Sequence, residues 1–336
     1  TPRSSSAASD VYKRQLEKRL AKFQDLVPSK VPFVEGKLKG HQDRSNYSIV
    51  GPGVSEDSKQ NVKIAEAHGF NIGAVSAAPL NGSGLHSHTT AEVFLIFSGS
   101  WRFYWGVDGK EGEVILNKGD VASFPTNMFR GFQNVSEDKE ALMFVVLGEN
   151  DPGVITWTPE LLKKAKESGM ILLEDNTLID LEKKDIPDGK KPIEPVNDKE
   201  LSSFDHYTSE EIEKYVIRYK DHLQYSVDDD HYNSNSIINY LDYFTIHDKK
   251  FDPNILHNTG FGLTMLKGKN AHIHPYSLNQ SEVFLCYEGE WQITCDDEIV
   301  TIGPKDTFSS PKNSVRSIKN ISDQEGSIFI VRQKNS

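Results

Sequence analysis

The sequence predicts an all-β-dominated protein made of two similar β-barrels, with added helices at the N-terminus and between the barrels. The first observation is an internal repeat: EVFLIFSGSW (92–101) returns as EVFLCYEGEW (282–291), and PTNMFRGFQNVS (125–136) returns as PKNSVRSIKNIS (311–322). The second is a succession of short strand-like runs separated by Gly, Asn and Asp turns, which is typical of sandwiches and barrels. A repeat of this kind indicates a duplicated domain.

The N-terminal domain is expected over residues 16–150. Residues 1–15 lack a Met and the apolar core of a signal peptide, so we interpret them as artefactual or disordered. Apolar residues at roughly helical spacing predict a short helix from Leu16 to Val27, which Pro28 ends. The runs that predict strands are NIGAV, EVFLIF, WRFYW, EVIL, VASF and ALMFVVL, between Asn71 and Leu147.

A helical and irregular linker is expected over residues 151–255. Thr158 and Pro159 predict the start of a helix that Gly169 ends. Residues 182–200 are rich in Lys, Asp and Pro, and TSEE (208–211) resembles a capping box. The apolar stripe behind it favours a helix packed on a barrel over a helix that docks a partner; it consists of Ile212, Tyr215, Val216 and Tyr219. The second barrel is then expected over 256–336.

Composition excludes some classes of function. The 336 residues carry a net charge of −11 with no offsetting basic stretch, which argues against partners such as nucleic acids or anionic membranes. No apolar run has membrane-spanning length. The two cysteines, Cys286 and Cys295, are predicted to be buried free thiols rather than a disulfide, and a cytoplasmic location is expected.

The candidate metal ligands are His86, His88 and Glu92. Histidines two residues apart on a strand face the same side. A carboxylate inside the apolar run AEVFLIF needs a partner if it is buried. Two imidazoles and one carboxylate form a metal set that leaves coordination positions open. The repeat supplies a second candidate set, His272, His274 and Glu282, with a longer spacing between histidines and glutamate.

These residues resemble the cupin superfamily, and the duplication resembles a bicupin. HSHTTAE (86–92) followed after six residues by Gly99 matches the first cupin motif, although its leading glycine is displaced, and Gly119, Pro125 and Asn134 match the second. The resemblance covers roughly 70–147 and 260–332. It implies double-stranded β-helix (jelly-roll) barrels whose ligands point inward.

Both copies depart from the family pattern in the same two ways. The histidine of the second motif, usually a fourth ligand, is Arg130 in one copy and Arg316 in the other. Asn127 and Asn313 replace a glycine. An arginine offers no lone pair to a metal. Arg130 is therefore predicted to bind a substrate carboxylate beside the metal, with Arg316 as a candidate for the same role.

The local charge supports an anionic substrate. A divalent metal with two neutral histidines and one glutamate leaves +1, and Arg130 raises this to +2. The alternative is that Arg130 pairs with Glu92 and no metal binds. Tyr104 is a further candidate for substrate binding, whereas Trp101 and Trp291 are expected to pack in the core.

Three functions remain open. The first is a metal-dependent dioxygenase, an oxidoreductase with Fe(II) as the first choice and Mn, Ni or Zn as alternatives. The second is a metal-dependent lyase, decarboxylase or isomerase of a small carboxylate, of which dimethylsulfoniopropionate lyases are an example in the family. The third is a metal-free binding protein. The strand with Glu92 is apolar on both faces, from Val93 to Phe97, so both faces must be covered, and a homodimer or higher homo-oligomer is expected.

Overall fold

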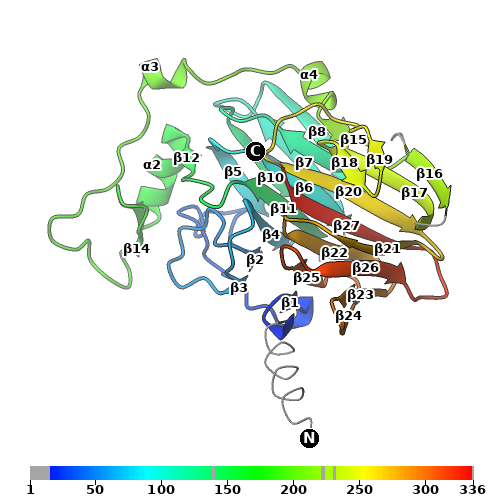
Figure 1. Ribbon diagram of the computed structural model, residues 1–336. Coiled ribbons are helices and arrows are strands. Elements are labelled where there is room, and N and C mark those ends of the chain that lie inside the picture. The colour runs from blue at the N-terminus through cyan, green and yellow to red at the C-terminus, as the bar shows by residue number, and fades with distance from the viewer. Residues whose placement is uncertain (1–15, 138–140, 221–223, 230–231, 335–336) are drawn as a thin grey trace, which may run out of the picture.

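The computed structural model describes residues 16–137, 141–220, 224–229 and 232–334, and the interpretation of residues 1–15 lies outside them. Two β-barrels dominate it (Figure 1). The helices are short: η1 (Phe23–Asp25), α2 (Pro159–Glu167), α3 (Asp198–Leu201) and α4 (Ser209–Glu213).

The first barrel is built from two sheets. The five-stranded sheet has the order β12-β5-β10-β7-β8, and the seven-stranded sheet has the order β15-β9-β6-β11-β4-β2-β3. Their bounds are β2 Arg44–Val50, β3 Val62–Ile64, β4 Phe70–Ala77, β5 Gly82–Ser87, β6 Glu92–Ser98, β7 Ser100–Trp105, β8 Gly112–Asn117, β9 Val121–Phe124, β10 Arg130–Asn134, β11 Ala141–Gly148, β12 Thr156–Trp157 and β15 Val216–Ile217.

The second barrel is one continuous sheet of order β1-β25-β22-β27-β20-β17-β21-β26-β23-β24, with β16 beside β17. Its bounds are β1 Leu20–Ala21, β16 Gln224–Asp229, β17 Tyr232–Leu241, β20 Phe261–Gly268, β21 His272–Ser277, β22 Glu282–Glu288, β23 Trp291–Cys295, β24 Glu298–Ile302, β25 Thr307–Ser310, β26 Val315–Asn320 and β27 Gly326–Gln333. Two small hairpins complete the described chain: β13 Met170–Leu172 with β14 Leu178–Asp180, and β18 Phe244–Ile246 with β19 Lys249–Phe251.

The two barrels share one topology. The order β9-β6-β11-β4 returns as β25-β22-β27-β20, and β5-β10-β7-β8 returns as β21-β26-β23-β24. Details repeat as well: the indole N–H groups of Trp101 and Trp291 donate to the carbonyls of Ser98 and Glu288, at 3.1 and 3.0 Å. The predicted duplication and the all-β jelly-roll class are confirmed.

The replacement of the motif glycine by asparagine has a backbone explanation. Asn127 and Asn313 have φ values of 57° and 62°, in the left-handed region. Glycine adopts this region without strain, and asparagine tolerates it better than most other residues. The shared departure from the family pattern therefore keeps the same turn in both barrels.

This explanation predicts the outcome of substitutions at Asn313, whose side chain is exposed. Asn313→Gly should change the free energy of unfolding by only a few tenths of a kcal/mol, whereas Asn313→Val should cost about 1–2 kcal/mol because a β-branched residue is strained there. Urea denaturation measures both. Lys312→Val, at an exposed neighbour with ordinary φ, is the control. Equal stability of the two valine variants would contradict the explanation.

The segment expected to be a linker is partly strand. The helix that follows Thr158 and the capping box of Thr208 and Glu211 are confirmed as the starts of α2 and α4. However, α4 ends at Glu213, and Val216–Ile217 pairs with β9 of the first barrel instead of continuing the helix. From Gln224 the chain already belongs to the second sheet, because β17 pairs with both β20 and β21. We therefore place the start of the second barrel near residue 224 rather than 256.

The helix predicted for residues 16–27 was wrong. Leu20 and Ala21 pair as a strand with Phe308 and Thr307 of the second barrel, and a 3-10 turn follows. Leu16 is buried in the second barrel's core, and Phe23 packs on the core between the barrels. Tertiary contacts with a sheet edge here override a weak local periodicity.

The strand β6 is covered on both faces within this chain. Phe94 and Ile96 lie in the core of the first barrel, where Phe94 contacts Phe103 with ring centroids 4.7 Å apart. Val93 and Leu95 belong to a second apolar cluster, which they share with Val283 and other residues of the second barrel. The second barrel thus covers the face on which the expectation of a dimer depended.

Two smaller expectations also have outcomes. Cys286 and Cys295 are buried thiols that form no disulfide with each other, as predicted. Among the described residues, no helix has the length and apolar character needed to cross a membrane.

Candidate metal site

His86, His88 and Glu92 meet at one end of the first barrel. His86 lies on β5, His88 follows the end of that strand, and Glu92 begins β6. One ligand atom from each side chain lies within 4.8 Å of the others, and the three residues are only 3, 2 and 6% exposed. In the described part of the chain, this is the one His/Cys/Asp/Glu group with such geometry. The predicted first set is therefore assembled.

The imidazoles are prepared to act as ligands. His86 Nδ1 donates to the carbonyl of Gly84 at 2.7 Å, which leaves the lone pair on Nε2. The indole of Trp157 packs against the His86 ring with centroids 5.3 Å apart. Neither ring nitrogen of His88 has a hydrogen-bond partner among the described residues, although both are buried. Since buried polar atoms are rarely left without a partner, these nitrogens point to a missing ligand.

Burial also keeps both histidines neutral. It lowers the pKa of His86 to about 3, assisted by the neighbouring His88 and the positive charge of Arg130. Burial and Arg130 hold the pKa of His88 well below its ordinary value. A metal binds the neutral form of imidazole. The donor set therefore fits a divalent cation such as Fe, Mn, Ni or Zn.

Glu92 and Arg130 form a buried ion pair. Arg130 Nη2 donates to Glu92 Oε2, and His88 Nε2 lies 3.7 Å from the same oxygen. The pair is not bidentate, because Nη1 and Nε of Arg130 have no partner among the described residues. Glu92 thus keeps ligand capacity while Arg130 keeps two unused donors. The sequence left two alternatives open, an ion pair between Arg130 and Glu92 or a metal site. The ion pair is present, and so is the geometry that a metal site needs.

A second buried carboxylate supports the strand that carries His86. Glu35 is 0% exposed, accepts hydrogen bonds from Arg44 Nη1 at 2.8 Å and Ser83 Oγ at 2.9 Å, and accepts from the Gly84 N–H at 2.7 Å. It therefore holds the peptide next to the carbonyl that orients His86. No local sequence pattern indicates this role, since Glu35 lies in an irregular segment 51 residues before His86.

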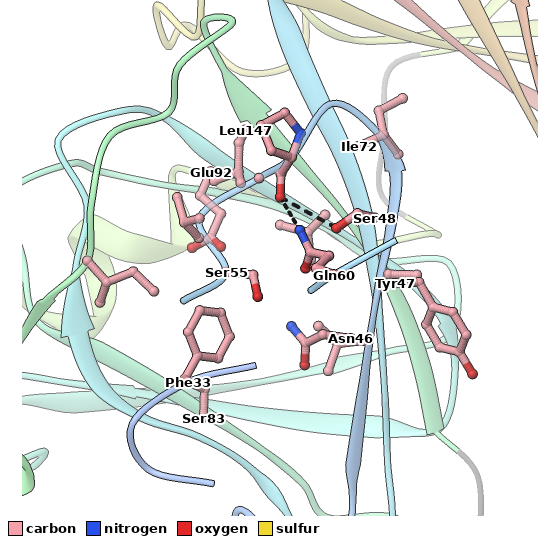
Figure 2. A pocket seen from close by; sticks show the side chains of 18 of the residues that line it. Phe33, Asn46, Tyr47, Ser48, Ser55, Gln60, Ile72, Ser83, Glu92 and Leu147 are labelled. Atoms are coloured by element: carbon pink, nitrogen blue, oxygen red, sulfur yellow. Dashed lines mark hydrogen bonds between the residues drawn. The ribbon is translucent and has the colours of Figure 1, made fainter. Parts of the chain in front are cut away.

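The site opens into a small cavity of about 70 Å³, which is room for about two waters or one small molecule. His86, His88 and Glu92 line it. Figure 2 shows Glu92 on one side and Ser48, Ser55 and Gln60 on another. The remaining walls are largely apolar and include Phe33, Val54, Ile72, Val75, Phe132, Val145, Leu147 and Ile155. Such a cavity suits a small ligand with few polar groups.

Tyr104 is not part of this cavity. Along β7, Trp101, Phe103 and Trp105 are buried in the barrel core, while Arg102 and Tyr104 alternate with them and are half-buried. The Tyr104 hydroxyl donates to the Ser83 carbonyl at 3.3 Å, and Arg102 lies over its ring. The predicted contact of Tyr104 with substrate is thus corrected: the two-residue alternation of the strand turns it away from the interior.

Glu56, which lies beside the site, makes a pH-dependent contribution to the free energy of unfolding. Its carboxylate accepts hydrogen bonds from the Trp157 indole and the Val34 N–H, both at 2.6 Å, and burial raises its pKa to about 8. In the unfolded chain, glutamate titrates near 4.3. The folded protein therefore keeps a proton that the unfolded chain releases between these values. Its contribution is complete at low pH and is lost as the pH rises toward 8.

Glu56→Gln should remove this part of the pH dependence. Between pH 5 and 8 the native protein should lose up to about 1.4 kcal/mol of unfolding free energy per pH unit through Glu56, and the variant should show a correspondingly flatter profile. Urea denaturation at each pH unit measures the slope. Glu160→Gln, at an exposed position on α2, is the control. Identical slopes in the native protein and Glu56→Gln would contradict the assignment.

Comparison with known proteins agrees with the fold and the site. The cupin domain family matches residues 75–147, which include the whole candidate metal set. This part of the chain therefore carries a cupin domain.

Two curated relatives come from Oryza sativa subsp. japonica. Putative germin-like protein 8-1 is 33% identical over 94 residues, and germin-like protein 8-2 is 33% identical over 92. Each match covers 26% of this chain and 42% of the relative, so it spans less than half of either protein.

Solved structures resemble both barrels together. The Lactobacillus farciminis oxalate decarboxylase formate complex aligns with a TM-score of 0.55 at 12% identity, over 94% of this chain and 86% of that one. Bacillus subtilis oxalate decarboxylase at pH 4.6 aligns with a TM-score of 0.53 at 12% identity, over 94% and 76%. At this identity the likeness concerns the fold, in which one chain forms two barrels.

The second cupin barrel does not assemble the predicted set of His272, His274 and Glu282. The two histidines are at least partly exposed, with Nε2 atoms 3.2 Å apart, and they form no three-residue group with Glu282. The sheet register explains this. Arg130 pairs with His86, but its counterpart Arg316 pairs with Tyr276.

The same register identifies the true counterparts of the ligands. Tyr276 and Leu278 lie six and four residues before Glu282, as His86 and His88 lie before Glu92. The second barrel therefore has a phenol and an alkyl chain where the first has imidazoles. The spacing to the glutamate, rather than the His-x-His pattern itself, was the signal that could have identified these residues.

Proposed function

We propose that this cupin is a metal-dependent enzyme that cleaves a small carboxylate substrate without oxygen, as a decarboxylase or lyase does. The observation that carries the proposal is the buried group of His86, His88 and Glu92 at the wall of a small, largely apolar cavity. These residues would hold the cation. When bound, it would supply Lewis-acid stabilisation of negative charge on the substrate.

The residues around the cation have distinct parts in this proposal. Gly84 holds His86 in one tautomer, and the two neutral imidazoles leave the cation's charge largely uncompensated. Glu92 contributes one negative charge and Arg130 one positive charge, so a divalent site carries +2 in total. Arg130 does not itself line the cavity but pairs with Glu92, which does. Its unused Nη1 and Nε donors suit a carboxylate oxygen, which supports Arg130 as an anchor for a substrate bound next to Glu92.

The size of the cavity favours a small acid. A volume of about 70 Å³ excludes a substituted aromatic substrate bound together with oxygen unless the site opens. The apolar walls lower the local dielectric constant and so strengthen the electrostatic interactions within the site. Oxalate is a suitable first substrate, because the two structural neighbours are oxalate decarboxylases by name.

A dioxygenase remains the second candidate. Three protein ligands leave open positions, which Fe(II) oxygen chemistry requires. Turnover distinguishes the two: the protein loaded with Mn, Fe, Ni or Zn is incubated with oxalate and with C3 and C4 acids under nitrogen and under air. Product formation under nitrogen supports the proposal. Turnover that needs oxygen in stoichiometric amounts would instead favour the dioxygenase.

Arg130 provides a specific prediction. Arg130→Met should leave the bound metal in place and raise KM for a carboxylate substrate by about tenfold or more, because a charge-assisted hydrogen bond is lost. Arg102→Met, on the outer side of β7, is the matched control. Metal content and KM are measured on the same preparations. Loss of metal with no effect on KM would show that Arg130 serves Glu92 rather than the substrate.

A further inference from the structure

The second barrel has a pocket of about 490 Å³ at its mouth, separate from the cavity of the first barrel. Arg332 on β27 lines it, together with residues from the β17–β18 turn and from the segment before β22. We propose that this pocket binds a small organic monocarboxylate with an apolar body, without a metal. The proposal does not depend on the function proposed for the first barrel.

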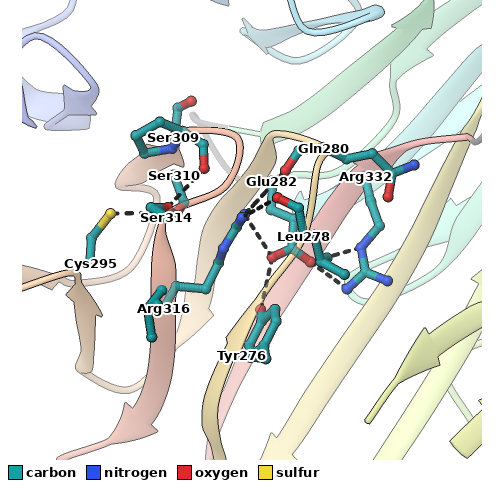
Figure 3. Close-up of polar contacts among 12 residues, drawn as sticks. Tyr276, Leu278, Gln280, Glu282, Cys295, Ser309, Ser310, Ser314, Arg316 and Arg332 are labelled. Atoms are coloured by element: carbon teal, nitrogen blue, oxygen red, sulfur yellow. Dashed lines mark hydrogen bonds and ion pairs between the residues drawn. The ribbon is translucent and has the colours of Figure 1, made fainter. Parts of the chain in front are cut away.

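The buried charge behind the pocket is unbalanced. Glu282 is 0% exposed, and Arg316 Nη1 donates to its Oε2 at 3.1 Å, while Arg332 Nε donates to its Oε1 at 2.8 Å. The Tyr276 hydroxyl also donates to Oε2, at 2.8 Å. Figure 3 shows the two guanidinium groups on opposite sides of this carboxylate. Two cations therefore share one anion, which leaves a charge of +1.

Such an excess is costly in a protein interior unless an anion accompanies it. Arg316 is 0% exposed, and its Nε has no partner among the described residues. Arg332 is the member of the cluster that reaches the pocket, with a side chain 12% exposed. Its Nη1 donates to the Thr245 carbonyl at 2.8 Å, which fixes the guanidinium at the pocket wall.

The fold does not require an arginine at this position, because the first barrel has a leucine there. Arg332 pairs with Glu282 in the sheet, and the corresponding partner of Glu92 is Leu147. The barrel that lacks the two imidazoles thus has a fixed cation beside its glutamate. In both proposals a positive charge binds an anionic ligand. The charge is that of the metal ion in the first barrel and that of Arg332 in the second.

The rim of the pocket adds to this charge. Lys250 and Lys334 line it, and among the described residues Asp242 is the one acidic residue that does so. With Arg332, the lining carries three positive charges and one negative charge, although the whole chain carries −11. The buried Arg316 and Glu282 cancel each other. An anion entering the pocket therefore meets a net charge of +2.

The other walls are suited to an apolar body. The lining includes Leu241, Tyr243, Phe244, Leu278 and Ile330. The guanidinium of Arg332 stacks over the Phe244 ring at 4.6 Å, so the charged and apolar parts of the wall adjoin. Leu278 stands where His88 stands in the first barrel. This pairing of a cation with an apolar wall selects a carboxylate with a hydrocarbon body over inorganic anions.

Benzoate is the probe, measured by isothermal titration calorimetry on the full chain after chelator treatment. Binding of one benzoate per chain in the millimolar range or tighter is expected, with at least tenfold weaker binding of benzyl alcohol, which lacks the charge. Lys250→Glu, at the exposed rim, should weaken benzoate binding at least fivefold. Lys184→Glu, an equal charge change at an exposed position of the linker, should not alter it.

A second pair of variants locates the site independently. Arg332→Met should weaken binding at least tenfold, with its fold verified by circular dichroism, while His86→Ala should leave it unchanged. The proposal is overturned by absence of benzoate binding at 50 mM, by equal binding of benzyl alcohol, by unchanged affinity in Lys250→Glu, or by loss of binding in His86→Ala. The last result would assign benzoate to the first barrel.

Discussion

His86→Ala should abolish metal binding to this protein. The native chain should hold one divalent cation, because the described residues contain one His-His-Glu group and the second barrel has Tyr276 and Leu278 in place of imidazoles. Removing one of three protein ligands should lower the metal affinity more than about 100-fold. In metalloproteins generally, the loss of a group that only supports a ligand already costs about 10–100-fold. Metal analysis after dialysis measures the content.

The control for this prediction is His272→Ala, which removes a histidine from the other His-x-His pair. It should keep the full metal content, because His272 does not meet Glu282. His88→Ala should behave as His86→Ala does. Two cations per chain, or retention of metal by His86→Ala, would show that the candidate site is misassigned.

Glu282→Ala should have the largest effect on stability. It leaves Arg316, which is fully buried, and Arg332 without their shared counterion. Breaking a buried ion pair by removing one partner costs about 3–5 kcal/mol. Urea denaturation of the native protein and the variant measures the difference. Binding of an anion in the neighbouring pocket should recover part of this loss.

Glu288→Ala is the matched control in the same strand. Glu288 lies at the end of β22, is 40% exposed, and pairs with Lys118 across the two barrels at 2.9 Å. Exposed pairs contribute about 0–1 kcal/mol. A loss at Glu282 no larger than the loss at Glu288 would mean that the cluster around Glu282 is not held by its charges.

The metal site shows how far local patterns lead. Alternation along a strand places His86 and His88 on one side, and the position of Glu92 within an apolar run indicates burial. Both inferences need only neighbouring residues, and the structure brings these three side chains together. Glu35 is different: it reaches Gly84 across 49 positions of the sequence, and no local pattern reveals such a contact.

The second barrel shows where a pattern misleads. His272 and His274 satisfy the same two-residue spacing, yet strand register decides which residues face the glutamate. Arg316 pairs with Tyr276, four positions beyond His272. Register follows from the pairing of whole strands and from the packing of their faces, so a motif of three residues cannot establish it.

Short-range alternation and repeated segments were enough to predict the duplication, the β class, most strand positions and the grouping of His86, His88 and Glu92. What covers the outer face of β6 and what surrounds Glu282 became known from the packing of segments that are distant in the sequence. An apolar face indicates that a partner is needed but not which one, and here Val93 and Leu95 pack against the second barrel of the same chain. Likewise, a buried glutamate indicates a need for compensation, and only the meeting of distant strands shows that arginines supply it.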